Sequence, residues 1–91
     1  MEVKTSQLNC AAYLSARGHK LLRVEAAGNG HRFCRFVFEC GPETQRDMDS
    51  YFEFRANIDA RTYAHALAKI KRMAREKLEE ETRNARNWAS P

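Results

Sequence analysis

Basic side chains recur at three- and four-residue steps late in the chain, a spacing that places them along one face of a helix. The stripe consists of Arg61, His65, Lys69, Arg72 and Arg75, and Lys71 widens it. A row of cations on one helix face can follow the phosphates of a nucleic acid. This stripe is therefore the first candidate binding surface.

The same spacing has an explanation that needs no ligand. Acidic residues follow four positions after basic ones, so the charges could pair with one another along a solvated helix. The pairs would be Arg72–Glu76, Arg75–Glu79 and Lys77–Glu81, and the acidic run at 79–81 would repel a polyanion locally. A basic block followed by an acidic block is equally suited to antiparallel pairing with a second copy.

A second candidate surface lies on a predicted β-hairpin. Arg23 and Arg35 are expected on the same face of its two strands, together with Phe33. An aromatic ring flanked by cations is the combination that proteins use to bind single-stranded nucleic acid. The alternative is that both guanidinium groups point into water and that Glu25 screens their repulsion.

Histidine and cysteine residues do not recur at the spacing of a metal site. The nearest approach is His31-x-x-Cys34, with Cys40 later on the same strand and His19 before the hairpin. That spacing is unlike the paired ligands of structural zinc sites, so we interpret the cysteines as small core residues. We therefore expect no metal ion and no cofactor.

No local motif places a nucleophile beside a base and an orienting third group. His65 lies among polar residues of the predicted long helix, where a solvated position explains it. The Gly28-Asn29-Gly30 segment joins two strands, so no helix N-terminus follows it to bind a phosphate. The chain is also short for a full core plus a deep pocket. We therefore expect a protein that is not an enzyme.

Length and charge fit one small domain. The 91 residues carry 16 lysines and arginines against 12 aspartates and glutamates, and of the net charge of +4, +3 falls on residues 59–91. Three cysteines without a CxxC pair, and the absence of an apolar leader, predict a reducing, cytoplasmic location. No apolar stretch approaches the roughly 20 residues that span a bilayer, so we expect no membrane association.

Turn and cap residues divide the chain into a helix, a hairpin and two further helices. Thr5 or Ser6 is suited to cap a first helix, which ends at Gly18 in the C′ position. Two β-type runs follow, at Lys20–Ala26 and Arg32–Cys40, and a turn cluster separates them.

The register of the hairpin depends on its loop. A three-residue loop at residues 28–30 gives the hairpin one continuous apolar face. The pairs would then be Leu22 with Phe36, Val24 with Cys34, and Arg23 with Arg35. A two-residue loop would instead place Val24 opposite Arg35. The first pairing is preferred because a half-buried sheet needs one apolar face.

Two further helices follow the hairpin. Pro42 is suited to the first position of a helix that runs to about Glu53. Asp59 can cap a last helix that nothing interrupts between Ala60 and Ser90, a rod of about 45 Å. Its first half carries an apolar seam of Tyr63, Leu67, Ile70, Ala74 and Leu78. The distal part outruns the core, so it frays, projects into solvent or packs against a second copy.

These elements predict a single α+β domain at residues 1–78, in the order helix, strand, strand, helix, helix. Residues 79–91 would form a charged helical extension or a frayed tail. The expected core consists of Leu14, Leu22, Val24, Cys34, Phe36, Phe38, Met48, Phe52, Leu67 and Ile70. The unpaired hairpin edge and the half-buried long helix favour a homodimer, with Leu78 and Trp88 as candidate contacts.

Four motifs carry a family resemblance. They are Ala12-x-Leu14-x-x-x-Gly18-His19-x-Leu21, Phe36-Val37-Phe38-Glu39, Tyr51-Phe52 and Asp59-Ala60-Arg61-x-Tyr63. Over about Thr5 to Met73, the chain resembles an uncharacterised family of short bacterial and phage-borne proteins that is defined only as a domain of unknown function. The resemblance implies a phage or mobile-element context, in which small regulatory and host-takeover proteins are common. The charged extension after Met73 is longer than the family pattern.

The sequence therefore favours a small non-enzymatic binding protein that acts on a protein or nucleoprotein target. The sharpest version is an inhibitor of host nucleic-acid-targeting machinery, which depends on the resemblance and on the charge pattern. The alternative is an accessory protein that binds nucleic acid directly through the basic face of the long helix. The candidate binding residues are Arg23, Phe33, Arg35, Arg61, Lys69, Arg72 and Arg75.

Overall fold

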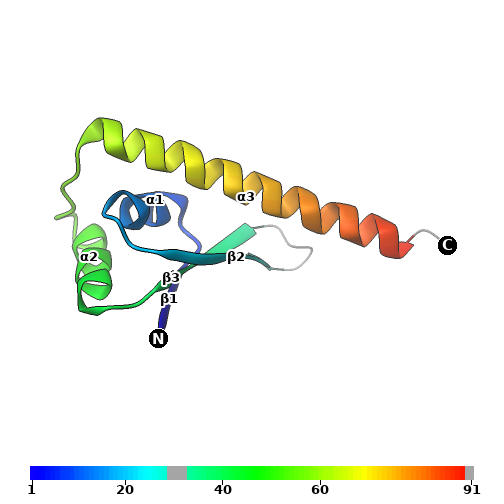
Figure 1. The fold of residues 1–91 in the computed structure, drawn as a ribbon, viewed down its shortest axis with the longest axis horizontal. Helices are drawn as coiled ribbons and strands as arrows, with labels where there is room; N and C mark the ends of the chain where they lie inside the picture. Colours follow the sequence, from blue (N-terminus) through cyan, green and yellow to red (C-terminus); the bar gives the residue numbers. More distant parts are fainter. Residues whose placement is uncertain (29–32, 90–91) are drawn as a thin grey trace.

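The chain forms a three-stranded antiparallel sheet with helices on one face. Its elements are β1 (Glu2–Thr5), α1 (Leu8–Ala16), β2 (Leu21–Ala27), β3 (Phe33–Glu39), α2 (Pro42–Phe52) and α3 (Ala60–Ala89). The computed structural model describes residues 1–28 and 33–89, with side chains as far as Arg83. α1 lies between the sheet and α3, and α2 stands beside α1 at one end of the molecule (Figure 1). The fold is therefore α+β, with the strand order β1-β3-β2.

β1 is a strand that the sequence pattern did not reveal, so the predicted two-stranded hairpin is part of a larger sheet. It pairs with β3, which becomes the central strand, through Glu2↔Glu39, Val3↔Phe38, Lys4↔Val37 and Thr5↔Phe36. Val3 is the strand's only aliphatic residue, and it packs against the core. A four-residue strand with one such residue shows too little alternation to be recognised.

The pairing of β2 with β3 is shifted by two residues from the predicted register. The pairs include Arg23↔Val37, Val24↔Phe36, Glu25↔Arg35, Ala26↔Cys34 and Ala27↔Phe33. Ala27 pairs with Phe33, so five residues separate the strands instead of the predicted three. Asn29 and Gly30 of the predicted loop lie outside the described residues. A shift by two keeps side chains on their predicted faces, but it separates Arg23 from Arg35.

An irregularity in β2 between Leu21 and Arg23 exchanges the roles of two leucines. Leu21 pairs with Phe38 and packs against the core, whereas Leu22 is 40% exposed. The prediction that Leu22 belongs to the core is therefore wrong. An extra residue in a strand breaks the period of two on which the prediction depended.

The core lies where α1, α3 and the inner face of the sheet meet. α1 contributes small residues, and Cys10, Ala11 and Ala12 are fully buried. The predicted core residues Leu14, Cys34, Phe36, Phe38 and Ile70 are buried, while Val24, Met48 and Leu67 are partly buried against them. Phe52 is exposed, so its assignment to the core is wrong; the preceding Tyr51 packs inward in its place.

The C-terminus of α1 lies where it was predicted, but its N-terminus does not. Gly18 has a φ of +91°, and its amide donates to Ser15 while the amide of His19 donates to Leu14. These two bonds form a Schellman termination with Gly18 at C′, as predicted. The helix starts after Gln7 rather than after Thr5 or Ser6 because Thr5 belongs to β1.

The starts of the other two helices agree with the prediction. Pro42 occupies the first turn of α2 and Glu43 follows it, an acidic residue where the helix dipole favours one. Asp59 accepts hydrogen bonds from the amide and the hydroxyl of Thr62, at 3.0 and 3.1 Å. These bonds lower the pKa of Asp59 and fix the N-terminus of α3.

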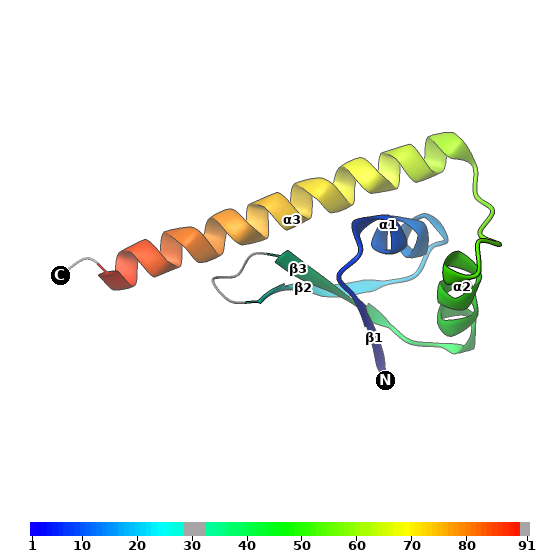
Figure 2. The same cartoon turned by 180° about the vertical axis from the view of Figure 1, so that it is seen from behind.

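α3 is much longer than the body that it covers. It contains 30 residues, and the molecule measures 51 Å in its longest dimension against 28 and 19 Å in the others. Figure 2 shows its C-terminal part extending past the ends of β2 and β3. The predicted seam packs on the body through Ile70, with Tyr63, Leu67, Ala74 and Leu78 at the rim. Within the described residues, no helix is long and apolar enough to cross a membrane.

A buried carboxylate ties α2 to the segment between α1 and β2. Asp47 accepts from His19 Nε2 at 2.6 Å and from Arg17 Nε at 3.4 Å. His19 Nδ1 lies 3.3 Å from the hydroxyl of Thr44, which donates to the backbone carbonyl of Glu39. Burial alone would raise the pKa of Asp47, but the bonds from His19 and Arg17 outweigh it and lower that pKa.

The Asp47→Asn variant is expected to lose about 1–2 kcal/mol of unfolding free energy at pH values where the carboxyl is ionised. A neutral amide accepts these hydrogen bonds more weakly than a carboxylate does. Because the folded pKa lies below the ordinary value of 3.8, the unfolded chain takes up a proton first. The stabilisation is therefore present above 3.8 and is lost as the pH falls through the folded value.

Urea unfolding followed by circular dichroism at about pH 5.5, 4 and 2.5 measures this difference. The wild type and the Asp47→Asn variant should converge at the lowest pH. Asp49→Asn is the matched control, because Asp49 is exposed and accepts from Gln45 of its own helix. A difference that persists unchanged at the lowest pH would contradict the role assigned to the ionised carboxylate.

Candidate functional site

The outer face of α3 carries the predicted basic stripe. Arg61, His65, Lys69, Lys71, Arg72 and Arg75 are all exposed. Residues 60–75 contain five lysines and arginines and no acidic residue, so this segment holds more positive charge than the net +4 of the whole chain. The partial positive charge of the helix N-terminus adds to the same region. α3 thus presents a cationic surface on the side that faces away from the core.

The ion pairs that would neutralise this stripe are mostly not formed. Among the described side chains, none of the five lysines and arginines at 60–75 lies within 4.0 Å of a carboxylate. Among the side chains described for residues 60–83, Lys77 is the one base that pairs along the helix, with Glu81 at 3.4 Å and Glu80 at 3.9 Å. A base placed before an acid opposes the helix dipole and makes a weaker pair than the reverse order. The arginines of the stripe are therefore available to a partner.

The open face of the sheet differs from the stripe because its charges pair with one another. Arg23 donates to both carboxylate oxygens of Glu2, at 2.8 and 2.9 Å, and to Glu25 at 2.8 Å. Lys4 lies 3.8 Å from Glu25. The hydrogen bonds from Arg23 lower the pKa of both glutamates. The register places Arg23 and Lys4 on either side of Val37, which is fully buried on the central strand.

The hairpin residues therefore form a less cationic surface than the sequence suggested. Arg35 lies opposite Glu25 instead of Arg23, and the guanidinium group of Arg23 already binds two carboxylates. Phe33 is 42% exposed, and its ring lies against Gly28, where an added Cβ would come within 2.6 Å of it. The binding role of these three residues stays a prediction, and the geometry gives it less support than it gives the stripe.

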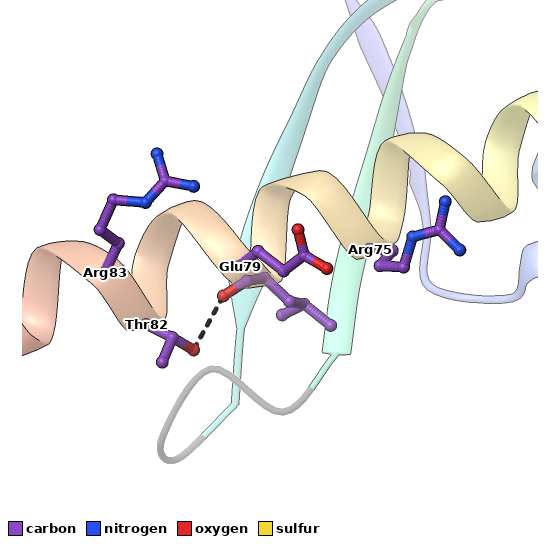
Figure 3. Close-up of a pocket in the computed structure, with 5 residues that line it drawn as sticks. Arg75, Glu79, Thr82 and Arg83 are labelled. Carbon is purple, nitrogen blue, oxygen red and sulfur yellow. Dashed lines mark hydrogen bonds between the residues drawn. The ribbon is translucent and has the colours of Figure 1, made fainter.

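A shallow depression of about 610 Å³ lies along the distal half of α3 (Figure 3). It is lined by Arg75, Leu78, Glu79, Thr82 and Arg83. The hydroxyl of Thr82 donates to the carbonyl of Leu78 at 2.9 Å, so it serves the helix itself. Leu78, a predicted dimer contact, is partly buried against the core. The other predicted contact, Trp88, has a side chain outside the described residues.

The cysteines behave as buried apolar groups. Cys10 and Cys34 are buried, and burial raises the pKa of both thiols. Cys40 is half-buried, and His31 of the weak metal pattern lies outside the described residues. Across residues 1–28 and 33–83, no three potential metal ligands come together.

An exposed aromatic surface at the end of α2 was not predicted. Tyr51, Phe52 and Phe54 line a hollow of about 450 Å³ together with Gln7 and Ala56. Phe52 meets Tyr51 edge to face, with ring centroids 5.3 Å apart. Phe52 is 47% exposed and Phe54 is 97% exposed. We call these five residues the aromatic surface.

The backbone of Phe54 is held in a conformation that glycine normally occupies. Its φ is +61°, the only positive φ of a non-glycine residue in the described chain. Its amide donates to Tyr51 and the amide of Arg55 donates to Ser50, at 3.2 and 2.8 Å. These bonds form the same Schellman termination as at Gly18, with phenylalanine at C′. The signal in the sequence was the lack of a glycine or asparagine after the predicted helix end.

The comparisons identify one family. A family described as Domain of unknown function (DUF5659) matches residues 1–76, which includes β1, the aromatic surface and the whole basic segment at 60–75. The acidic run at 79–81 lies beyond the matched residues. No match was found among curated proteins or among solved structures.

Phe54→Gly is expected to raise the free energy of unfolding by about 0.5–1 kcal/mol. Glycine relieves the left-handed strain of about 1–2 kcal/mol. Part of this gain is lost because glycine has more conformational freedom in the unfolded chain. The substitution removes no packing because the ring is 97% exposed. Thermal and urea unfolding test this, with Phe52→Gly as the control, which should lower stability by weakening the last turn of α2 and removing the contact with Tyr51. Equal losses for both variants would contradict the argument.

Proposed function

The chain belongs to the DUF5659 family, and we propose that it acts as a small non-enzymatic binding protein that contacts nucleic acid through the outer face of α3. The observation that carries this proposal is the segment at 60–75, whose five lysines and arginines have no acidic neighbour in the segment and no ion-pair partner among the described side chains. Exposed cations without counterions are a suitable surface for a polyanion.

The length of the stripe supports a contact with several phosphates. Arg61 and Arg75 are 14 residues apart, which corresponds to about 21 Å along the helix axis. One strand of a duplex places about six phosphates over that distance. The side chains project from a straight helix whose opposite side is fixed to the core by Ala66 and Ile70, so they are presented in a defined row.

A protein or nucleoprotein target is the second candidate. Its sharpest form is an inhibitor of host nucleic-acid-targeting machinery encoded by a phage or mobile element. The observation that favours a protein target is Phe54, an almost fully exposed phenylalanine that nothing in the fold requires. A homodimer through Leu78 and the distal part of α3 belongs to the same group of proposals.

Reversal of two stripe charges, in an Arg72→Glu, Arg75→Glu variant, is expected to weaken nucleic-acid binding at least tenfold. Fluorescence anisotropy with short single- and double-stranded DNA and RNA at low and moderate salt measures this. For about four phosphate contacts, the logarithm of the wild-type affinity should fall with the logarithm of salt with a slope of about −3 to −4. The variant should have a shallower slope.

A matched control separates the stripe from the overall charge. Lys20→Glu with Arg46→Glu changes the net charge by the same amount at exposed positions away from α3. This control should bind almost as well as the wild type. Equal losses in both double variants would argue for nonspecific attraction, and no wild-type binding at low salt would leave a protein target as the function.

A further inference from the structure

Phe54 of the aromatic surface has no structural role that explains its exposure. Phe54 contributes almost no buried area, and its backbone takes a conformation that costs a bulky residue free energy. Exposed apolar groups held in a strained conformation are characteristic of interaction sites. The hollow beside Phe54 has walls from three separate parts of the chain, namely the start of α1, the end of α2 and the connection to α3.

The shape of the surface suits one protruding side chain. Phe52 and Phe54 flank a hollow of about 450 Å³, which exceeds the volume of a single aromatic or long aliphatic side chain. Such an anchor in an aromatic pocket is the usual centre of a protein contact. Gln7 and the hydroxyl of Tyr51 are the polar groups among the lining residues.

The charges around this surface exclude a polyanion as its natural occupant. Residues 43–59, which supply most of the aromatic surface, contain five acidic and two basic residues. Arg55 is paired with Glu53, and the buried Asp47 is paired with Arg17 and His19 outside the segment. Glu43, Asp49, Glu53 and Asp59 are exposed. This segment is negative where the adjacent segment at 60–75 is positive, so a basic partner fits the aromatic surface and a nucleic acid does not.

The same charges disfavour a second copy of this chain. Two aromatic surfaces placed face to face would bring two acidic segments together. The basic outer face of α3 from another copy would match in charge, but the apolar groups it exposes in the described residues are Ala64 and Ala68. An alanine methyl group is too small to fill the hollow. We therefore assign the surface to a different protein, and the oligomeric state of the wild type tests a second copy.

We propose that the aromatic surface is a docking site for a protein segment that inserts one aromatic or long aliphatic side chain between Phe52 and Phe54. The segment places lysine or arginine residues next to that anchor, opposite Asp49. This site is separate from the stripe on α3. The protein then has two surfaces of opposite charge. The acidic one binds the basic segment of a partner protein, and the basic one on α3 binds a polyanion.

A displayed library of random peptides is the probe for this site, with the intact protein as bait. The wild type should enrich peptides that carry an aromatic or long aliphatic residue beside lysine or arginine. An enriched peptide, labelled for fluorescence anisotropy, should bind the Phe54→Gly variant at least tenfold more weakly. The glycine variant keeps the backbone geometry of its turn, so loss of binding cannot be attributed to unfolding.

Two controls separate this site from other surfaces. Leu22→Ser removes an exposed apolar side chain from β2 and should bind the peptide as the wild type does. The Arg72→Glu, Arg75→Glu variant should also bind it normally, which distinguishes failure of the docking site from failure of the nucleic-acid surface. The Asp49→Lys variant should weaken peptide binding by repelling the basic residues of the peptide.

Several results would overturn the proposal. These are no enrichment over an empty support, enrichment of acidic peptides, or peptide binding that Phe54→Gly leaves unchanged. Sedimentation equilibrium of the wild type and of Phe54→Gly tests whether a second copy of the chain occupies the surface. A wild-type dimer that dissociates in the variant would assign the surface to a second copy and reject a foreign partner.

Discussion

The packing of α1 between the sheet and α3 is the contact on which the other elements depend. Cys10, Ala11, Ala12 and Leu14 are completely buried, so the middle of this helix is covered on all sides. Its small side chains allow α3 to approach closely, and Ile70 of α3 reaches the same cluster as the phenylalanines of β3. Larger residues on α1 would separate both neighbours from it, because a close-packed interior has no room for them.

This arrangement determines which surfaces are left for partners. With one side of α3 used against α1 and the sheet, the opposite side is free to carry cations that no core residue contacts. On the open face of the sheet the charges are paired instead. They cover Val37, and the paired residues are Glu2, Arg23, Lys4 and Glu25. Positive charge is thereby concentrated on residues 60–75 of α3, whereas on the sheet the charges are balanced locally.

Much of the fold could be predicted from the sequence because its signals are local. Gly18, Pro42 and Asp59 act on their own helix ends, and the seam on α3 follows the helical period. The strand at Glu2–Thr5 could not be predicted, because its partner is 30 residues or more away along the chain and it has a single aliphatic residue. The hairpin register failed because a β2 irregularity and a longer connection both depend on packing. Of the candidate surfaces, the stripe could be predicted from the spacing of its charges. The aromatic surface could not, because the exposure of Phe54 depends on how the end of α2 packs against the rest of the fold.

The dependence of α1 on α3 has a consequence for the order in which the chain can fold. The apolar side of the first helix, complete by Ala16, is covered by residues that follow Tyr63, and the edge strand at the N-terminus needs β3 as its partner. During synthesis, β1 and α1 therefore stay exposed to water until most of the chain has been made. A fragment that ends before Leu78 lacks part of this cover and would expose the apolar residues that chaperones and proteases recognise.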